Sequence, residues 1–180
     1  PKPSSAASDV YKRQELEGPI VESVESMFAV DWYTESGENL DIVVGARNEG
    51  VAEPSTGDVL QLVPSGPGYL TEPNLRMFNS IVHNAKEQLT LCSPYFVPEE
   101  SLLEAITSAC YRGVRVDLFV GEKADQFMVQ HAQSSYYDAL LKAGVRIWEF
   151  PAPYVLHTKF VLADPGSEDA VGVLGSSNMD

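Results

Sequence analysis

The sequence predicts an α/β domain in which helices flank a largely parallel or mixed β-sheet. Short apolar segments suited to strands alternate with longer segments whose apolar residues recur at helical spacing. This β-α-β-α-β-α-β order is typical of parallel strands joined by crossover helices. With 180 residues and 44% hydrophobic content, the chain is long and apolar enough to bury one core of ordinary size.

The predicted elements follow from periodicity and from their flanking residues. An amphipathic helix is expected from Gly18-Pro19 to about Trp32-Tyr33, because proline suits an early helical position. A linker rich in Gly, Glu, Ser and Asn follows at 34–58. The remaining expected strands are 59–63, 89–92, 114–120, 145–150 and 156–164, and the remaining expected helices are 73–87, 99–112 and 125–143.

The most informative of these segments is the expected strand 156–164. On a strand His157 and Lys159 would leave the same face, because successive side chains alternate between the two faces. An imidazole beside an ammonium, near a small-residue turn with Ser and Asn, could bind a developing oxyanion and transfer a proton. On its own the H-x-K pair occurs in many proteins without a catalytic role, and it also fits a core histidine paired with a carboxylate.

The longer pattern is more specific. His157, Lys159 and Asp164 form H-x-K-x-x-x-x-D, which the sequence Gly175-Ser-Ser-Asn178 follows. This combination resembles the signature of the phospholipase D superfamily, and the sequence from Gly175 to its end resembles the cardiolipin synthase branch. The stretches that begin at residues 93, 112 and 135 agree with that branch, so the resemblance runs from about residue 16 to the last residue.

The resemblance implies a role for each residue of the signature. His157 is expected to be the general acid, and Lys159 is expected to bind a phosphate oxygen with help from Asn178 and Ser176. Asp164 belongs to the catalytic signature, although we expect it to hold local structure rather than to touch substrate. No cofactor or metal is required, because lysines supply the positive charge around the phosphate.

For the other candidate residues, an ordinary structural role explains the sequence as well as or better than a role in the site. Tyr95 and Phe96 lie in a turn between two prolines, where they could either adjoin the substrate or cap the core. The Gly-rich loop at 64–68 lacks the spacing of a phosphate-binding loop. His83 and His131 have no metal-ligand partners at a convincing spacing, so we interpret both as ordinary helix residues.

The resemblance also predicts how the chain is divided. Residues 1–14 resemble the translation of a sequencing adapter and are set aside. Residues 15–58 would end the first phospholipase D-like half and form a linker, and 59–180 would be a second half truncated at its C-terminus. Ten residues separate Asp164 from Gly175 where the family usually has roughly six, which predicts a longer hairpin at 165–170. With the first signature absent, the fragment is expected to be inactive unless two copies pair.

Composition limits the possible partners. The net charge of −14 argues against nucleic-acid binding and leaves no polybasic patch for anionic lipids. No apolar run is long enough to cross a bilayer, so the fragment is expected to be soluble. Cys92 and Cys110 fit core thiols in a reducing compartment. Membrane contact would come from segments absent here.

The function that the resemblance implies is that of a phosphatidyltransferase of the cardiolipin synthase type at the bacterial cell membrane. Such an enzyme transfers a phosphatidyl group between two phosphatidylglycerols through a phosphohistidine intermediate, using a partner signature from the missing N-terminal half. The alternatives are a phospholipase D that hydrolyses phosphatidyl esters and a noncatalytic half-domain. A nuclease of the superfamily fits the acidic charge less well.

Overall fold

The computed structural model describes residues 9–10, 15–40, 59–66, 69, 71–122 and 127–179, with residues 9–10 and 127–130 described by their backbone only. The chain divides into two compact units, one comprising residues 13–73 and the other residues 74–180 together with 1–12. The two compact units therefore meet at 73/74. The division at 58/59 into two phospholipase D-like halves stays a prediction. The short strand β1 (Asp9–Val10) lies in the larger unit and within the segment 1–14 that resembles a sequencing-adapter translation.

The smaller unit contains one helix, α1 (Ile20–Ser36), within its described residues. The helix was predicted, but it continues past Trp32-Tyr33 to Ser36. Gly37 caps its end with a φ of 72° and donates its backbone N–H to the carbonyl of Tyr33 at 2.9 Å. The strand predicted at 59–63 is wrong. The backbone there is irregular and Val59 is 94% exposed, since none of the strands in the described part of the chain pairs with this apolar segment.

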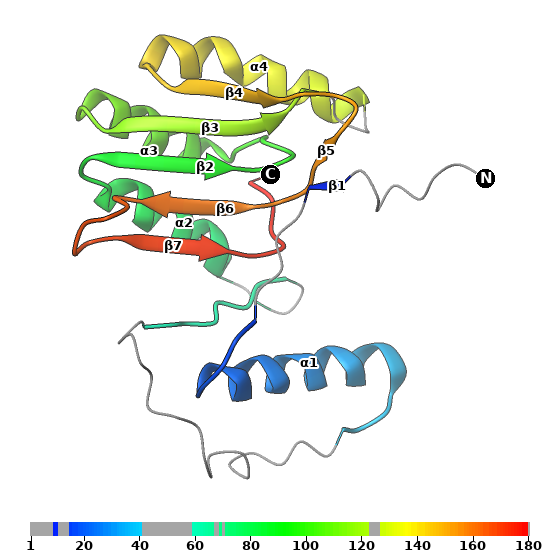
Figure 1. The fold of residues 1–180 in the computed structure, drawn as a ribbon. Helices are drawn as coiled ribbons and strands as arrows, with labels where there is room; N and C mark the ends of the chain where they lie inside the picture. Colours follow the sequence, from blue (N-terminus) through cyan, green and yellow to red (C-terminus); the bar gives the residue numbers. More distant parts are fainter. Residues whose placement is uncertain are drawn as a thin grey trace. The chain divides into compact units, whose positions relative to one another are not determined.

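The larger unit is a five-stranded sheet in the order β4-β3-β2-β6-β7 (Figure 1). Strands β2, β3 and β4 are parallel to one another, whereas β6 is antiparallel to both β2 and β7. A separate parallel pair joins β1 to β5. The mixed sheet confirms the predicted fold class. The strands are β2 (Gln88–Cys92), β3 (Arg115–Gly121), β4 (Arg146–Phe150), β5 (Val155–Leu156), β6 (Phe160–Ala163) and β7 (Val171–Leu174).

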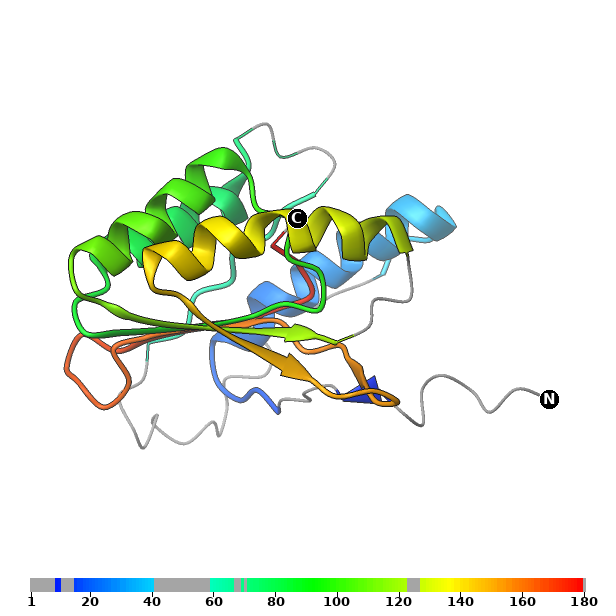
Figure 2. The same cartoon turned by 90° about the horizontal axis from the view of Figure 1, so that it is seen from above.

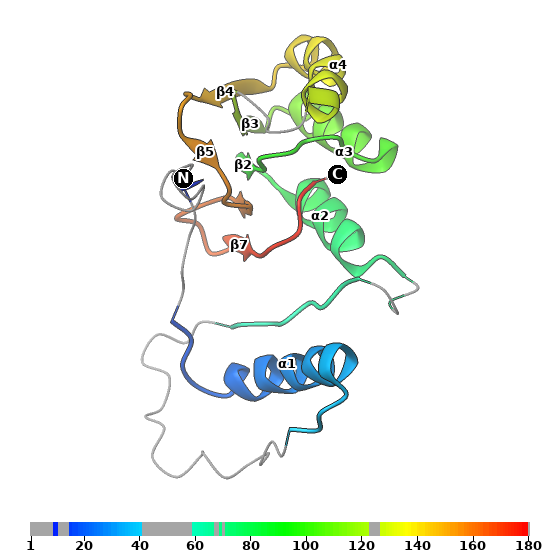
Figure 3. The ribbon, with the colours of Figure 1, turned by 90° about the vertical axis from the view of Figure 1, so that its right-hand side faces the viewer.

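Three helices connect the strands and cover one face of the sheet (Figures 2 and 3). They are α2 (Pro73–Asn84), α3 (Glu100–Tyr111) and α4 (Phe127–Ala143), so each predicted helix is present with shifted ends. Gly113 and Gly144 follow α3 and α4 with φ values of 93° and 107°, a backbone conformation that favours glycine. None of the helices in the described ranges is both long enough and apolar enough to cross a bilayer.

The hydrophobic core lies between these helices and the sheet. Alternate residues of β3, namely Val116, Leu118 and Val120, face the helices and are at most 1% exposed. Cys92 and Cys110 are free thiols, buried and half-buried, as the sequence predicted. The helix-facing core is built mainly from Phe78, Val82, Leu89, Leu91, Phe96, Leu102, Ile106, Leu118, Leu140 and Val161.

The opposite face of the sheet is left open by the described helices of this unit (Figure 2). One row of successive cross-strand partners runs across all five strands on this face. It consists of Leu174, Phe160, Cys92, Phe119 and Trp148. Within this row, Phe119 is 37% exposed and Trp148 is 49% exposed, and their rings stack with centroids 6.2 Å apart. This face is therefore aromatic and accessible to solvent.

Candidate active site

Three segments that carry predicted site residues leave the sheet at the same end. Phe160, the first residue of β6, pairs with Cys92 at the end of β2 and with Leu174 at the end of β7. Because β6 is antiparallel to both neighbours, residues 157–159, residues 93–97 and residues 175–179 all emerge beside one another (Figure 1). The register therefore brings the segments 157–159 and 175–179 to the same end of the sheet, with 15 residues of chain between them.

The predicted continuous strand 156–164 is wrong in its first part. Strand β5 ends at Leu156 and β6 begins only at Phe160, so His157 and Lys159 lie in an irregular segment between two strands. The break occurs because β5 pairs with β1 whereas β6 pairs with β2 and β7. The two side chains do not share a strand face: His157 is exposed, and Lys159 is only 8% exposed.

Lys159 is held close to the backbone of this segment. Its ammonium Nζ donates a hydrogen bond to the carbonyl oxygen of His157 at 2.8 Å. The next carbonyl, that of Thr158, accepts a weak hydrogen bond from the Cys92 thiol at 3.5 Å. A lysine with so little exposure interacts with an anion in surroundings of lower dielectric constant than water, where electrostatic attraction is stronger.

The turn at 175–179 supplies the amide and hydroxyl groups. Ser176 is exposed, and Asn178 is partly buried. Ser177 accepts a hydrogen bond at its Oγ from Asn74 Nδ2 at 2.6 Å, and Met179 donates its backbone N–H to Ser93 Oγ at 3.2 Å. The side-chain oxygen of Asn178 is buried and has no hydrogen-bond partner among the described residues. The backbone on both sides of Asn178 is thus fixed.

Tyr95 and Phe96 have different environments. Phe96 is fully buried in the hydrophobic core, so the structure corrects the expectation that it adjoins the substrate. Its backbone N–H donates to Gln133 Oε1 at 3.0 Å, which ties this segment to α4. Tyr95 is partly exposed and lies in the segment that leaves the sheet beside residues 157–159. Only Tyr95 keeps the position expected of a substrate-adjacent residue.

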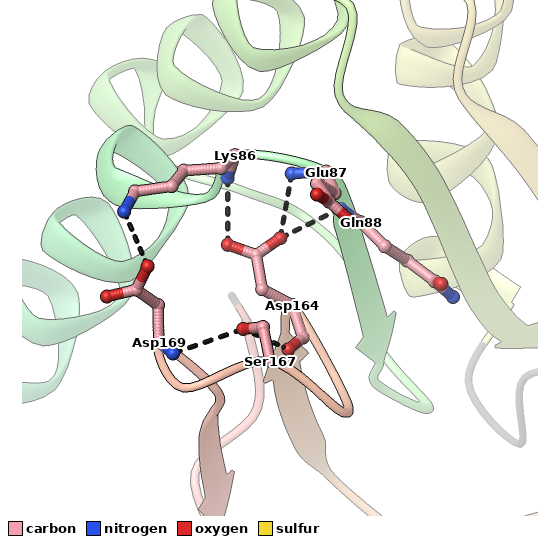
Figure 4. A network of polar contacts seen from close by, with 6 residues as sticks. All are labelled: Lys86, Glu87, Gln88, Asp164, Ser167 and Asp169. Carbon is pink, nitrogen blue, oxygen red and sulfur yellow. Dashed lines mark hydrogen bonds and ion pairs between the residues drawn. The ribbon is translucent and has the colours of Figure 1, made fainter.

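Asp164 lies at the other end of β6. Its carboxylate accepts backbone N–H groups from Lys86 at 2.8 Å, Glu87 at 2.8 Å and Gln88 at 2.9 Å, all at the start of β2 (Figure 4). Lys159 and Asp164 flank the four residues of β6 and are five residues apart, which is roughly 16 Å at about 3.3 Å per residue. The signature aspartate is therefore not brought together with His157 and Lys159. It joins β6 to β2, which fits the structural role expected from the resemblance.

The electrostatics of Asp164 follow from these contacts. Burial by itself would raise the pKa of the Asp164 carboxyl group. The three backbone hydrogen bonds and the nearby Lys86 ammonium outweigh this effect, so the pKa of Asp164 is lowered. Lys86 also bonds Asp169 at 2.5 Å, and this hydrogen bond together with the charge of Asp169 raises the pKa of Lys86.

A hairpin follows Asp164, at the place where the sequence predicted one. Strands β6 and β7 form an antiparallel pair joined by residues 164–170. The turn is closed by the Ser167 hydroxyl, which donates to the Asp164 carbonyl at 2.8 Å and accepts the Asp169 N–H at 3.1 Å (Figure 4). This turn lies at the end of β6 opposite to the segment that carries His157.

Sequence reasoning assigned no role in the site to Asn74, Ser93 or Gln133. Each makes its contact with a residue at least 37 positions away, as in the pair between Asn74 and Ser177, which lie 103 residues apart. Pattern and local spacing carry no signal for such pairs. The arrangement as a whole offers an exposed imidazole and several hydrogen-bond donors at one sheet end, which is chemistry suited to an anionic oxygen and a proton transfer.

The fold and site define a class of protein: an α/β domain in which a loop imidazole, a shielded lysine and an Asn-bearing turn meet at one sheet end. Residues 79–180 match the family described as "Cardiolipin synthase, PLD-like domain". The chain belongs to this family.

Individual relatives agree with the family assignment. Cardiolipin synthase A of Serratia proteamaculans (strain 568) is 36% identical over 165 residues, which are 92% of this chain and 33% of the relative. Cardiolipin synthase A of Yersinia pseudotuberculosis serotype O:1b (strain IP 31758) is 35% identical over the same shares. The chain thus spans about a third of the length of these curated relatives.

Among solved structures, the phospholipase D family member Nuc from Salmonella typhimurium superposes with a TM-score of 0.48 and 20% identity, covering 61% of this chain and 66% of that chain. NucT from Helicobacter pylori gives a TM-score of 0.46 and 20% identity, covering 59% of this chain and 67% of that chain.

Proposed function

We propose that this chain is part of a phosphatidyltransferase of the cardiolipin synthase type, which joins two phosphatidylglycerols and releases glycerol. The observation that best supports the proposal is the register that brings residues 157–159 and 175–179 to the same end of the sheet. The family membership of residues 79–180 supports the reaction class. The substrate lies in a membrane, and we propose that other parts of the protein hold the site at the bacterial cell membrane.

The proposed reaction has two steps at one phosphorus atom. A histidine nitrogen from the other half of the protein attacks phosphorus and forms a P–N bond, while the P–O bond to glycerol breaks and His157 gives its proton to the departing oxygen. In the second step a hydroxyl of another phosphatidylglycerol attacks, His157 accepts the hydroxyl proton, and the P–N bond breaks. The exposed imidazole of His157 is accessible to both alcohols.

The charged and polar residues have supporting roles in this proposal. Lys159 stabilises the equatorial phosphate oxygens, assisted by Asn178 and Ser176 as hydrogen-bond donors. Asp164 keeps β6 in register with β2 and does not contact the substrate. Because the attacking histidine belongs to another part of the protein, we predict that the 180-residue chain alone has no turnover unless two copies supply both histidines.

The test is turnover of labelled phosphatidylglycerol by the full-length gene product. Cardiolipin with glycerol supports the transferase, whereas phosphatidic acid as the only product shows a hydrolase and replaces our proposal. Substitution His157→Ala should lower kcat by about 10²- to 10⁴-fold, the usual contribution of a general acid. The matched control His83→Ala removes an exposed imidazole on α2 and should leave kcat unchanged. If the wild type is active and His157→Ala keeps its kcat, the role of His157 as general acid is refuted.

A further inference from the structure

Asn178 lies between two residues whose positions are fixed by distant parts of the fold. On one side, Asn74 donates a hydrogen bond from Nδ2 to Ser177 Oγ at 2.6 Å. On the other side, the Met179 backbone N–H donates to Ser93 Oγ at 3.2 Å. The first contact comes from the first turn of α2 and the second from the end of β2, so two separate elements hold the turn.

The contact through Ser93 is rigid because its hydroxyl has no freedom left. Ser93 is fully buried, and its Oγ donates to the carbonyl of Tyr95 while it accepts from Met179. A second backbone hydrogen bond, from Val97 N–H to the Met179 carbonyl at 3.0 Å, extends the pairing. Gln133, which is 2% exposed, fixes the same segment by accepting the Phe96 N–H.

The contact through Asn74 closes the other side of the turn. Asn74 is partly buried and follows Pro73 at the start of α2, where the helix backbone restricts its movement. Its hydrogen bond to Ser177 is short, at 2.6 Å, and joins two side chains that are both partly buried. Removing the Asn74 amide leaves Ser177 without this contact, and the turn is then held at Met179 alone.

The Asn178 side chain itself has little to fix it. No described residue bonds its buried oxygen, so the direction of the amide follows from the backbone that Asn74 and Ser93 hold. An amide that binds a phosphate oxygen in the transition state must be placed closely, because a misplacement of about 1 Å can lower the rate by roughly 10²-fold. The two anchors therefore lie where a small change would be transmitted to the reacting group.

We propose that Asn74 and Ser93 are positioning residues that together orient Asn178 toward the phosphate. This inference rests on the proposed function, since it takes Asn178 as a phosphate-binding group. It adds two residues outside the signature, from α2 and from the segment after β2, to the machinery of the reaction. Neither residue contacts the substrate in this proposal, and both act through the backbone of residues 177–179.

The first test measures the turn directly and does not depend on turnover. Hydrogen exchange of the peptide 172–179 is followed in the 180-residue chain and in the variants Asn74→Leu and Ser93→Ala. We expect at least about tenfold faster exchange at Met179, whose N–H bonds Ser93 Oγ, in both variants, because each loses one anchor of the turn. Unchanged exchange in variants that remain folded by thermal unfolding would overturn the inference.

Asn79 provides a matched control on the same helix. Its Nδ2 donates to Ser101 Oγ at 3.0 Å, so it makes the same type of Asn-to-Ser bond away from the turn. The variant Asn79→Leu should leave exchange at 172–179 unchanged. The variant Asn74→Asp should restore slow exchange, because its carboxylate can accept a hydrogen bond from the Ser177 hydroxyl.

The second test is kinetic and uses the full-length gene product with phosphatidylglycerol. Both Asn74→Leu and Ser93→Ala should lower kcat by about 10- to 100-fold with a smaller change in KM, and Asn74→Asp should recover most of kcat. If the wild type is active and both variants keep its kcat, the inference about Asn74 and Ser93 is overturned while the proposed function stands. A wild type without turnover would refute the proposed function, and the exchange data would then decide the anchoring of Asn178 independently.

Discussion

The hydrogen bonds of Asp164 allow a quantitative prediction about stability. Substitution Asp164→Asn keeps the size of the side chain and suits its φ of 48°, a left-handed conformation that Asn tolerates as well as Asp does. One oxygen can still accept two backbone N–H groups, but the new amide N–H₂ group meets the third N–H in place of a carboxylate oxygen. The substitution therefore removes one charged hydrogen bond and weakens two others.

The magnitude follows from the type of bond. A hydrogen bond to a charged group contributes about 1.5–3 kcal/mol, and a neutral one about 0.5–1.5 kcal/mol. Water can reach Lys86 and Glu87, which are exposed, and it recovers part of the loss. We expect Asp164→Asn to lower the free energy of unfolding by about 2–4 kcal/mol in urea denaturation at pH 7.

The control and the pH dependence make this prediction specific. Asp138→Asn removes an exposed carboxylate that pairs with Lys142 on the same helix at 2.7 Å, and it should change stability by less than about 0.5 kcal/mol. Because the folded pKa of Asp164 is lowered, its contribution is complete above the unfolded pKa of about 3.9 and declines as the pH falls through the folded value. Wild type and Asp164→Asn should therefore converge in strong acid. Equal stability at pH 7 would refute the reasoning.

Three further substitutions, with Gly172→Ala as a control, test the core, a contact between two strands and a helix end. Leu118→Ala opens a cavity at a fully buried residue of β3 and should cost about 2–5 kcal/mol in urea denaturation. Asp117→Asn weakens the hydrogen bond that Trp148 Nε1 donates to Asp117 at 2.7 Å. We expect about 1–2 kcal/mol of destabilisation and a change in tryptophan fluorescence. An unchanged fluorescence spectrum would contradict the contact. Gly144→Ala forces a side chain onto a φ of 107° and should cost about 1 kcal/mol in urea denaturation. Its control Gly172→Ala lies in ordinary strand backbone, with Leu162 at 3.7 Å from the new Cβ, and should be near neutral in the same assay.

Much of the fold was predictable because its elements carry local signals. The helices α2, α3 and α4 and the strands β2, β3 and β4 were all predicted, with ends that differ by a few residues. Apolar residues at helical spacing mark each helix, and a glycine follows α3 and α4 where the backbone must turn. The sequence did not predict the direction of the last strands, because the composition of an apolar strand is the same whether its neighbour is parallel or antiparallel.

The errors arose where pairing partners decide the structure. An apolar segment at 59–63 has the composition of a strand, but no described strand pairs with it. The segment 156–164 reads as one strand, but its two ends pair with different strands and residues 157–159 lie between them. Periodicity describes one segment at a time and cannot show a change of partner.

The candidate site was predictable only in part for a similar reason. The sequence alone identified His157, Lys159 and Asn178, and the register of β6 and β7 brings their segments to one sheet end. The contacts of Asp164 with residues 86–88 and of Ser93 with Met179 span 76 to 86 positions, so only the folded chain reveals them. Phe96 was ambiguous in sequence because a buried aromatic and a substrate-contacting aromatic follow the same pattern.

The open aromatic face of the sheet has a consequence for how the chain behaves in solution. Molecules with a net charge of −14 repel one another while few counterions are present, and the repulsion keeps the exposed rings of Phe119 and Trp148 apart. Added salt shortens the screening length from about 30 Å at 0.01 M to about 8 Å at 0.15 M. Colloidal stability of the isolated chain is therefore greatest in dilute buffer and declines as ionic strength increases.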